Sequence, residues 1–306
     1  METPSPPPER PDSQTTDDVD NLSLQQRARR YPRSRIIVEP LLWTKLQLDL
    51  LQCTFAGPYP APPVIMELDN PSNERVSRAF AAAFKGLVTR HRSDAMRYIF
   101  CAYDGLLKSV NDVYFYFGAR HPLLPCLAFV VRSEIEPGPV PIVAAHIDFR
   151  QLAELRARKI YNQCTGRRRH LPGLALGKLI LKKFRTDEPL HEPYIVALLI
   201  AVAQSQWWFI VKSGLESRAS GVKPRVLFTT DDKESIYLYS AKVSSAFIYM
   251  LNNPQTPPTT PQPLHIQITK IPCKPHDTLR NRLYALILSA TTPRDVSISA
   301  DVVIYK

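Results

Sequence analysis

Two hydrophobic periodicities run along the chain, and they predict both helices and strands. Helices are expected where apolar residues recur every three or four positions, or where alanine dominates. These segments are 40–51, 74–90, 94–110, 149–160, 174–185, 246–251 and 278–289. Strands are expected where β-branched and aromatic residues cluster in short runs. These segments are 113–117, 127–131, 142–147, 226–230, 235–239, 264–271 and 296–305. The mixture predicts an α+β fold.

The local signals at the ends of these segments refine the expectation. Four polar residues, 231–234, separate two predicted strands and have the turn chemistry of a β-hairpin. Ser244 or Ser245 is placed to cap the short helix that follows. The elements over 264–305 form a predicted β-α-β unit, which is right-handed if its strands are parallel in one sheet.

The most apolar segment, 193–211, contains nineteen residues without a charge. A transmembrane helix needs about 20 such residues, but Gln204, Ser205 and Gln206 lie in a row that a bilayer core tolerates poorly. The apolar run before them has the ten-residue length of a buried helix. We therefore expect a core helix and no membrane span, with 207–211 entering the core as a strand or as the end of the helix.

Composition divides the chain into an arm and a body. Residues 1–34 are rich in proline and polar side chains and poor in large apolar ones, which predicts a disordered arm. The late basic run of this arm, RARRYPRSR, fits a nuclear import signal or a solvated arm leading into the fold. Residues 35–306 are expected to form a single α+β domain. A proline-rich loop over 253–263 interrupts it and offers a site for a protein partner.

Cysteine usage indicates the compartment. The five cysteines are odd in number, scattered and never spaced as CxxC, and the amino terminus lacks the apolar stretch of a secretory signal. This pattern predicts free thiols in a reducing compartment, either the cytoplasm or the nucleus.

The positive charge of the chain is concentrated in one segment. The whole protein has a net charge of +11, and residues 151–186 hold ten Lys and Arg against one acid, Glu154, which leaves +9 there. A local excess of this kind favours a polyanionic partner such as nucleic acid. The alternative is a solvated helix face with a flexible basic loop, partly neutralised by the acids at 187, 188 and 192.

Nine basic side chains of this segment are predicted to contact the polyanion. They are Arg156, Arg158, Arg167, Arg168, Arg169, Lys178, Lys182, Lys183 and Arg185. Helical spacing sets Lys178, Lys182 and Arg185 in one stripe, with Leu176, Ile180 and Phe184 on another side. Few aromatic residues lie nearby, so contacts to a phosphate backbone are favoured over reading of a base sequence.

Two motifs resemble catalytic sites but lack the spacing or a residue that the site requires. The run Gly173–Leu179 has one residue too few between its glycines for a phosphate-binding loop and lacks the Ser or Thr after its lysine. The pair His191–Glu192 begins like a zinc-protease motif, but position 195 is Ile rather than the second histidine. No GxSxG occurs. We therefore expect no cofactor.

Two groups of potential metal ligands leave a metal-dependent function as an alternative. His146 and Asp148 are two apart on a predicted strand and could share a metal ion or a proton, or Asp148 could simply cap the next helix. Asp231, Asp232 and Glu234 could hold a hard cation such as Mg²⁺, or could be solvated turn residues.

Three stretches, HEPYIVALLIAVAQSQ, VLFTTDDKESIYLYSAKVSSAFIYML and LHIQITKIPCKPHDTLRNRLYALIL, cover roughly residues 190–290. Over them the chain resembles a group of uncharacterised proteins of filamentous fungi. The resemblance implies a soluble intracellular protein and carries no functional residue to transfer.

Taken together, the sequence predicts an intracellular, non-enzymatic binding protein whose 151–186 surface engages a polyanion, such as nucleic acid. One alternative is a metal-dependent phosphodiesterase or nuclease, in which Asp148, Asp231, Asp232 or Glu234 holds the metal and the basic surface holds the substrate. The other is a scaffold protein without a ligand.

Overall fold

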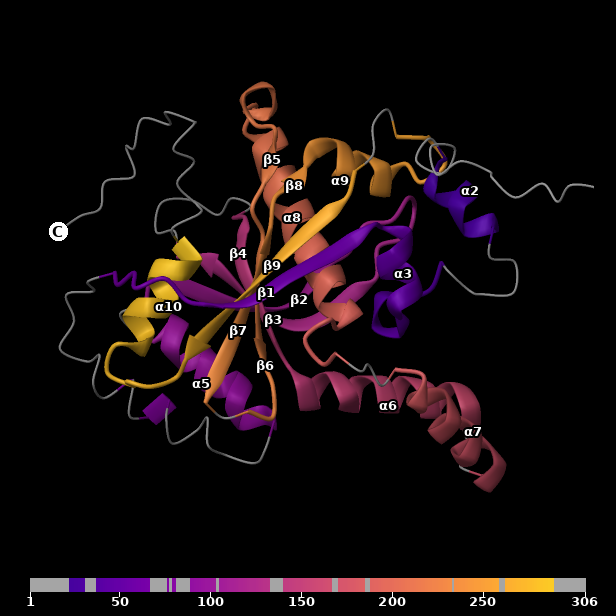
Figure 1. Ribbon diagram of the computed structural model, residues 1–306, viewed down its shortest axis with the longest axis horizontal. Helices are drawn as coiled ribbons and strands as arrows, with labels where there is room; N and C mark the ends of the chain where they lie inside the picture. The colour runs from indigo at the N-terminus through magenta and orange to yellow at the C-terminus, as the bar shows by residue number, and fades with distance from the viewer. Residues whose placement is uncertain are drawn as a thin grey trace, which may run out of the picture.

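A seven-stranded mixed sheet forms the centre of the protein, in the strand order β1-β9-β7-β6-β4-β3-β2 (Figure 1). The computed structural model describes residues 22–30, 37–66, 76, 79–80, 89–102, 105–132, 140–166, 170–184, 188–232, 234–258 and 262–288. The strands are β1 Cys53–Pro60, β2 Leu107–Tyr114, β3 Leu123–Val131, β4 Ile142–Asp148, β6 Arg225–Thr229, β7 Ser235–Ala241 and β9 Leu264–Pro272. A separate ribbon pairs β5 Gly221–Val222 with β8 Val243–Ser244. The predicted α+β fold is confirmed.

Helices cover both faces of this sheet. On one face lie α8 Pro193–Lys212, α3 Lys45–Leu50 and α9 Ser245–Asn252, and on the other lie α5 Thr89–Cys101 and α10 Leu279–Leu288 (Figure 1). The remaining helices are α2 Leu24–Arg29, α6 Phe149–Thr165, α7 Leu171–Lys182 and the short 3-10 turns η1 Pro40–Leu42 and η2 Glu216–Arg218. Two apolar cores result, one on each side of a single sheet.

The central strands are mainly apolar on both faces because both faces are covered. Along β4, Ala145 and Ile147 enter the core beneath α8, whereas Val143 and Ala144 enter the core beneath α5 and α10. Strand β4 runs parallel to β6, and their register sets Asp148 beside Thr229. This pairing places polar side chains at the end of an otherwise apolar strand pair.

The long apolar helix α8 packs as a core element. Pro193 begins it, and the Glu192 side chain accepts a hydrogen bond from the Tyr194 backbone N–H as its cap. By length and composition alone α8 could cross a membrane, but 67% of its most apolar window is buried inside the protein. This is the packing expected for the central helix of a soluble domain. Residues 207–211 form the end of the helix.

Several other predicted elements are confirmed. Strands β6 and β7 form the antiparallel hairpin around 231–234, and Ser244 caps α9 by accepting a hydrogen bond from the Phe247 N–H at 3.0 Å. Helix α7 begins three residues before the predicted 174–185 segment. The predicted strand 296–305 lies outside the described residues, so the closing β-α-β unit stays a prediction.

The structure differs from the expectations in three places. Residues 53–60 form the strand β1, which the sequence patterns did not predict, and its Pro58 and Pro60 are tolerated because the strand lies at the edge of the sheet. The helix expected over 94–110 ends at Cys101 and the chain turns into β2. Gly105 lies in this turn, and a Cβ there would lie 2.5 Å from the Phe100 carbonyl oxygen.

The third correction concerns the predicted disordered arm. Residues 24–29 form α2, which begins with a capping box between Ser23 and Gln26. Leu24 is buried in the core, and the Gln25 N–H donates to the Pro254 carbonyl at 3.0 Å. The first turn of the proline-rich loop therefore helps to hold α2. The rest of the predicted arm, 1–21 and 31–34, lies outside the described residues.

Truncation of Leu199 to Ala on α8 is expected to lower the free energy of unfolding by about 2–5 kcal/mol, because this fully buried side chain would leave a cavity in the core. Urea denaturation followed by circular dichroism measures the change. The matched control is Leu171→Ala, which removes the same atoms from an exposed side chain and should change the stability by less than about 0.5 kcal/mol. Equal losses in the two variants would contradict the burial of α8.

Candidate functional site

Helices α6 and α7 form a hairpin that projects from the body of the protein (Figure 1). Helix α6 begins directly after β4, where the Asp148 side chain accepts hydrogen bonds from the backbone N–H groups of Arg150 and Gln151. The only described element with an extensive contact to α7 is α6. The predicted basic segment is therefore largely a protruding helical hairpin.

Glycine, not leucine, forms the buried side of α7. Gly173 and Gly177 are buried and are four residues apart, so they lie on one face of the helix. A Cβ at Gly177 would lie 2.6 Å from Cδ1 of Tyr161, and one at Gly173 would lie 2.7 Å from the Cys164 carbonyl oxygen. The absence of side chains at these two positions lets α7 lie close against α6.

Because the glycine face of α7 packs against α6, both leucine and lysine side chains of α7 are exposed to solvent. Leu171, Leu176 and Leu179 are 81%, 51% and 58% exposed. The sequence placed Leu176 on an apolar side with Ile180 and Phe184, but only the latter two are partly buried. Leu176 was misplaced because the glycine face, which carries no hydrophobic signal, decides which way α7 turns.

The predicted polyanion-binding residues fall into three groups. Arg158, Lys178, Lys182 and Lys183 are exposed, and no acidic side chain of the described residues pairs with them. The loop and helix-end arginines lie outside the described residues. These are Arg167, Arg168, Arg169 and Arg185. The ninth residue, Arg156, is in a different environment.

Arg156 is buried, which corrects its assignment to the basic surface. Its two terminal nitrogens donate to the Glu192 carboxylate at 2.9 and 2.5 Å, and its Nε donates to the Leu41 carbonyl at 2.9 Å. The Phe184 ring lies 5.1 Å from the guanidinium carbon. Arg156 thus ties α6 to the start of α8, and none of this charge is available to a ligand.

The buried face of α6 explains the error. It comprises Leu152, Arg156 and Ile160, at intervals of four residues. The apolar spacing in the sequence favours a face through Phe149, Ala153, Ala157 and Ile160, of which only Ile160 is buried. An arginine in the centre of a buried face gives no hydrophobic signal. A second cation, Lys159, pairs with Glu39 at 2.6 Å on the partly exposed flank of the same helix.

His146 and Asp148 belong to a closed, buried polar network. The Asp148 carboxylate accepts from Arg92 Nη1 and from the Thr229 hydroxyl, both at 2.9 Å, through Oδ2. Its Oδ1 accepts the two backbone N–H groups that cap α6. His146 Nε2 lies 3.2 Å from the Thr229 hydroxyl oxygen. Because the Thr229 hydroxyl donates its proton to Asp148, its oxygen accepts the hydrogen bond from His146 Nε2.

This network does not have the properties of a catalytic site. All four side chains are fully buried, so no substrate contacts them. Burial lowers the pKa of His146 to about 4, against an opposing effect of Asp148, so the imidazole is neutral near pH 7. Four donors already occupy the Asp148 carboxylate, so it functions as the predicted helix cap and as a structural anchor.

The acids of the β6–β7 turn do not converge on a metal position. Asp231 accepts from Arg150 Nε at 2.5 Å in an exposed ion pair, and the Asp232 carboxylate accepts the Glu234 backbone N–H at 2.8 Å. Among the residues that the structure describes, no group of three His, Cys, Asp or Glu side chains could hold a metal ion. Three of the four carboxylates named for the nuclease alternative, those of Asp148, Asp231 and Asp232, thus have other contacts.

Four of the five cysteines have a raised pKa and are therefore not activated nucleophiles. All five are free thiols. Burial raises the pKa of Cys53 and of Cys273 to about 12. It also raises the pKa values of Cys101 and Cys126 above the ordinary thiol range. These four thiols therefore remain protonated at neutral pH.

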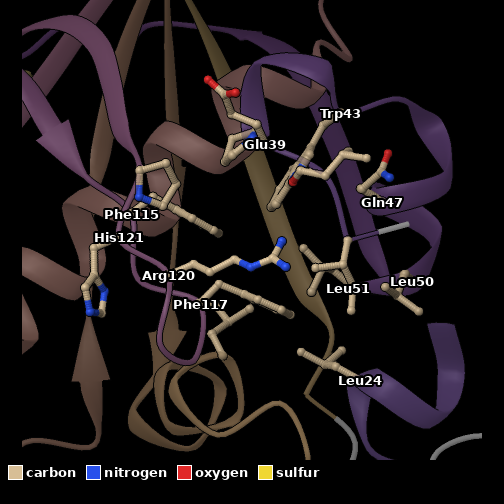
Figure 2. Close-up of a pocket in the computed structure, with 15 residues that line it drawn as sticks. Leu24, Glu39, Trp43, Gln47, Leu50, Leu51, Phe115, Phe117, Arg120 and His121 are labelled. Atoms are coloured by element: carbon tan, nitrogen blue, oxygen red, sulfur yellow. The ribbon is translucent and has the colours of Figure 1, made fainter. Parts of the chain in front are cut away.

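The structure also has a cavity that the sequence did not predict. It lies next to residues 39–41, the segment that Arg156 and Lys159 of α6 contact. It has a volume of about 470 Å³ and is enclosed by α2, the η1 turn, α3 and the β2–β3 connection (Figure 2). Most of its walls are apolar, including Leu24, Trp43, Leu51, Phe115 and Phe117. No sequence motif could indicate it, because its lining residues come from four separate stretches of the chain, at 24, 37–51, 115–122 and 251.

Replacement of Glu192 by Gln is expected to lower the free energy of unfolding by about 3–5 kcal/mol, because it leaves the Arg156 guanidinium buried without a counter-charge. The double variant Arg156→Met/Glu192→Gln should recover a large part of that loss. Urea denaturation of the single and double variants tests this coupling. In the control, Lys159→Met removes only a partly exposed pair and should cost less than about 1 kcal/mol.

In comparisons with known proteins, no family model matches the chain and no curated protein shows significant similarity to it. The resemblance to fungal proteins over 190–290 therefore stays a prediction. The function has to be inferred from the side chains that the fold brings to the surface.

Proposed function

We propose that this chain is a non-enzymatic binding protein that engages a polyanion, such as nucleic acid, through the outer surface of the α6–α7 hairpin. The observation that carries the proposal is the exposure of Arg158, Lys178, Lys182 and Lys183 on a projecting element, without acidic partners among the described residues. Four further arginines, at 167–169 and 185, are adjacent to this surface in the sequence.

The physical basis is an uncompensated local field. At physiological ionic strength the Debye length is about 8 Å, so clustered charges reinforce one another whereas distant ones are screened. Lysines at intervals of four residues lie on one side of a helix and can neutralise successive phosphates. The hairpin offers few exposed aromatic rings, which favours contact with a charged backbone over stacking with bases.

The exposed leucines favour a second candidate, an anionic membrane surface. Leu171, Ala175 and Leu179 are exposed at intervals of four residues, and Lys178 and Lys183 flank them on the helix. A helix of this kind can lie in the headgroup region, with its apolar stripe toward the acyl chains and its lysines at the anionic lipids. Nucleic acid provides no apolar contact for these leucines.

The remaining proposals concern the setting of the protein. Five free thiols fit a reducing compartment, so we propose the cytoplasm or the nucleus. The proline-rich loop at 254–263 remains a proposed site for a protein partner. A metal-dependent nuclease is not favoured, because Asp148 and Asp231 already have basic partners.

Reversal of three lysines, Lys178, Lys182 and Lys183 to Glu, is expected to abolish measurable binding to heparin and to duplex DNA at 150 mM salt. A milder variant has Gln at these three positions. In it, the negative slope of log affinity against log salt should become shallower by about 3, since each phosphate contact contributes about 0.9 to its magnitude. Fluorescence anisotropy at two or more salt concentrations measures both effects.

The matched control carries the same charge change elsewhere, with Glu at Lys223, Lys242 and Lys270. These lysines are also exposed and have no acidic partner in the described part of the chain. The control should weaken binding only slightly. If both triple variants lose affinity equally, net charge rather than the hairpin accounts for binding, and the proposal fails.

Replacement of Leu171 and Leu179 by Ser tests the membrane candidate. Co-sedimentation with vesicles of phosphatidylserine and phosphatidylcholine should fall by at least tenfold, because two apolar contacts of the interfacial stripe are lost. Heparin binding should be unchanged, since the lysines remain. Vesicle binding that is insensitive to the leucines would exclude the interfacial arrangement, and binding to DNA but not to vesicles would favour nucleic acid.

A further inference from the structure

The cavity of about 470 Å³ has the size of a small-molecule site and contains an unusual polar group. Arg120 lies in the connection between β2 and β3, where its backbone pairs with Phe117 at 2.9 and 3.1 Å. Figure 2 shows the Arg120 side chain extending across the cavity between Trp43 and Phe117. A permanent positive charge thus faces apolar walls.

The other polar side chains that line the cavity have contacts of their own. Glu39 pairs with Lys159 at 2.6 Å, and the Gln47 side-chain oxygen accepts from the Thr44 backbone N–H at 2.7 Å. His121 packs beside the Tyr116 ring, with the ring centres 4.9 Å apart. No acidic side chain of the described residues forms an ion pair with Arg120. Within the described part of the chain, the cavity therefore has a cation without a counter-charge.

We propose that this cavity binds a single-chain amphipathic molecule with an anionic head group, a carboxylate or a phosphate monoester. The guanidinium presents a planar fork of donors that matches either oxyanion. The apolar part of the ligand lies among Leu24, Leu51, Phe115 and Phe117, which exclude water from it. This site is separate from the hairpin surface and does not depend on polyanion binding.

Charge selects this ligand class over the alternatives. A cationic amphipath would be repelled by Arg120, and an uncharged alcohol would leave the guanidinium without an ionic partner after partial desolvation. A strongly polar molecule, such as a sugar, would leave the apolar walls unmatched. A chain with one anionic end satisfies both parts of the cavity.

Binding can be followed in the full-length protein through Trp43, which lines the cavity and is buried. Titration with octanoate, decanoate and decyl phosphate should change the tryptophan fluorescence with saturation, and calorimetry gives the affinity independently. Each methylene added between octanoate and decanoate should tighten binding by about fourfold. A comparison of decanoate with decyl phosphate distinguishes a fatty-acid source from a phosphorylated lipid source.

The decisive variant is Arg120→Met, which keeps the apolar stem and removes the charge. Decanoate should bind at least about tenfold more weakly to this variant, whereas decanol should bind to it at least as tightly as to the unmodified protein, because the desolvation penalty of the guanidinium is removed. Arg218→Met is the matched control, because Arg218 is also exposed but lies in η2, away from the cavity. It should bind decanoate like the unmodified protein. Trp43→Phe should abolish the fluorescence change while calorimetric binding persists.

Two results would overturn the proposal. One is decanoate binding that is equally tight in Arg120→Met, which would exclude anion recognition by this residue. The other is the absence of any calorimetric binding by the carboxylates and the alkyl phosphate up to their solubility limits. Neither result would affect the hairpin proposal, which the heparin, DNA and vesicle measurements test on a different surface.

Discussion

The buried carboxylate of Asp148 is the constraint on which the position of the hairpin depends. It is the last residue of β4 and the cap of α6, and it accepts hydrogen bonds from α5 through Arg92 and from β6 through Thr229. An ionised carboxylate is stable in an apolar core only when charge and hydrogen bonds replace water. The four donors around Asp148 meet that requirement. They also fix the direction in which α6 leaves the sheet.

The described cations of 151–186 divide into two classes, which explains why a count of basic residues overstates the number of charges that a ligand can contact. Arg156 and Lys159 face the body and are matched by Glu192 and Glu39. Arg158 and the three lysines at 178, 182 and 183 face solvent. The first class holds the hairpin to the domain, and only the second can attract a partner. A rigid attachment of this kind presents the outward charges at a fixed place, which favours binding over a freely moving basic tail.

Hydrophobic periodicity, turn residues and capping residues predicted most of the fold. The elements that depart from these patterns were not predicted from the sequence. The β6–β7 hairpin, the Ser244 cap and the buried helix α8 follow from turn residues, capping chemistry and hydrophobicity. Strand β1 was missed because Pro58 and Pro60 mask an edge strand, and the end of α5 was missed because Gly105 interrupts an apolar pattern. The hairpin orientation depends on Gly173 and Gly177, and the Arg120 cavity depends on the meeting of distant segments. Neither has a signal in local sequence.

Residues 39–41 contact the hairpin and also border the cavity, although the two surfaces differ in their chemistry. The Leu41 carbonyl accepts from Arg156, and Glu39 pairs with Lys159, so the segment at 39–41 is held by α6 on one side and borders the cavity with Glu39 and Pro40 on the other. The pair with Lys159 also neutralises Glu39, the one acidic side chain among the described residues that line the cavity. Arg120 forms no ion pair with Glu39 or with any other acidic side chain that the structure describes. The same basic segment thus faces solvent with the lysines of its outer face, and it holds the 39–41 wall of the cavity with Arg156 and Lys159 of its inner face.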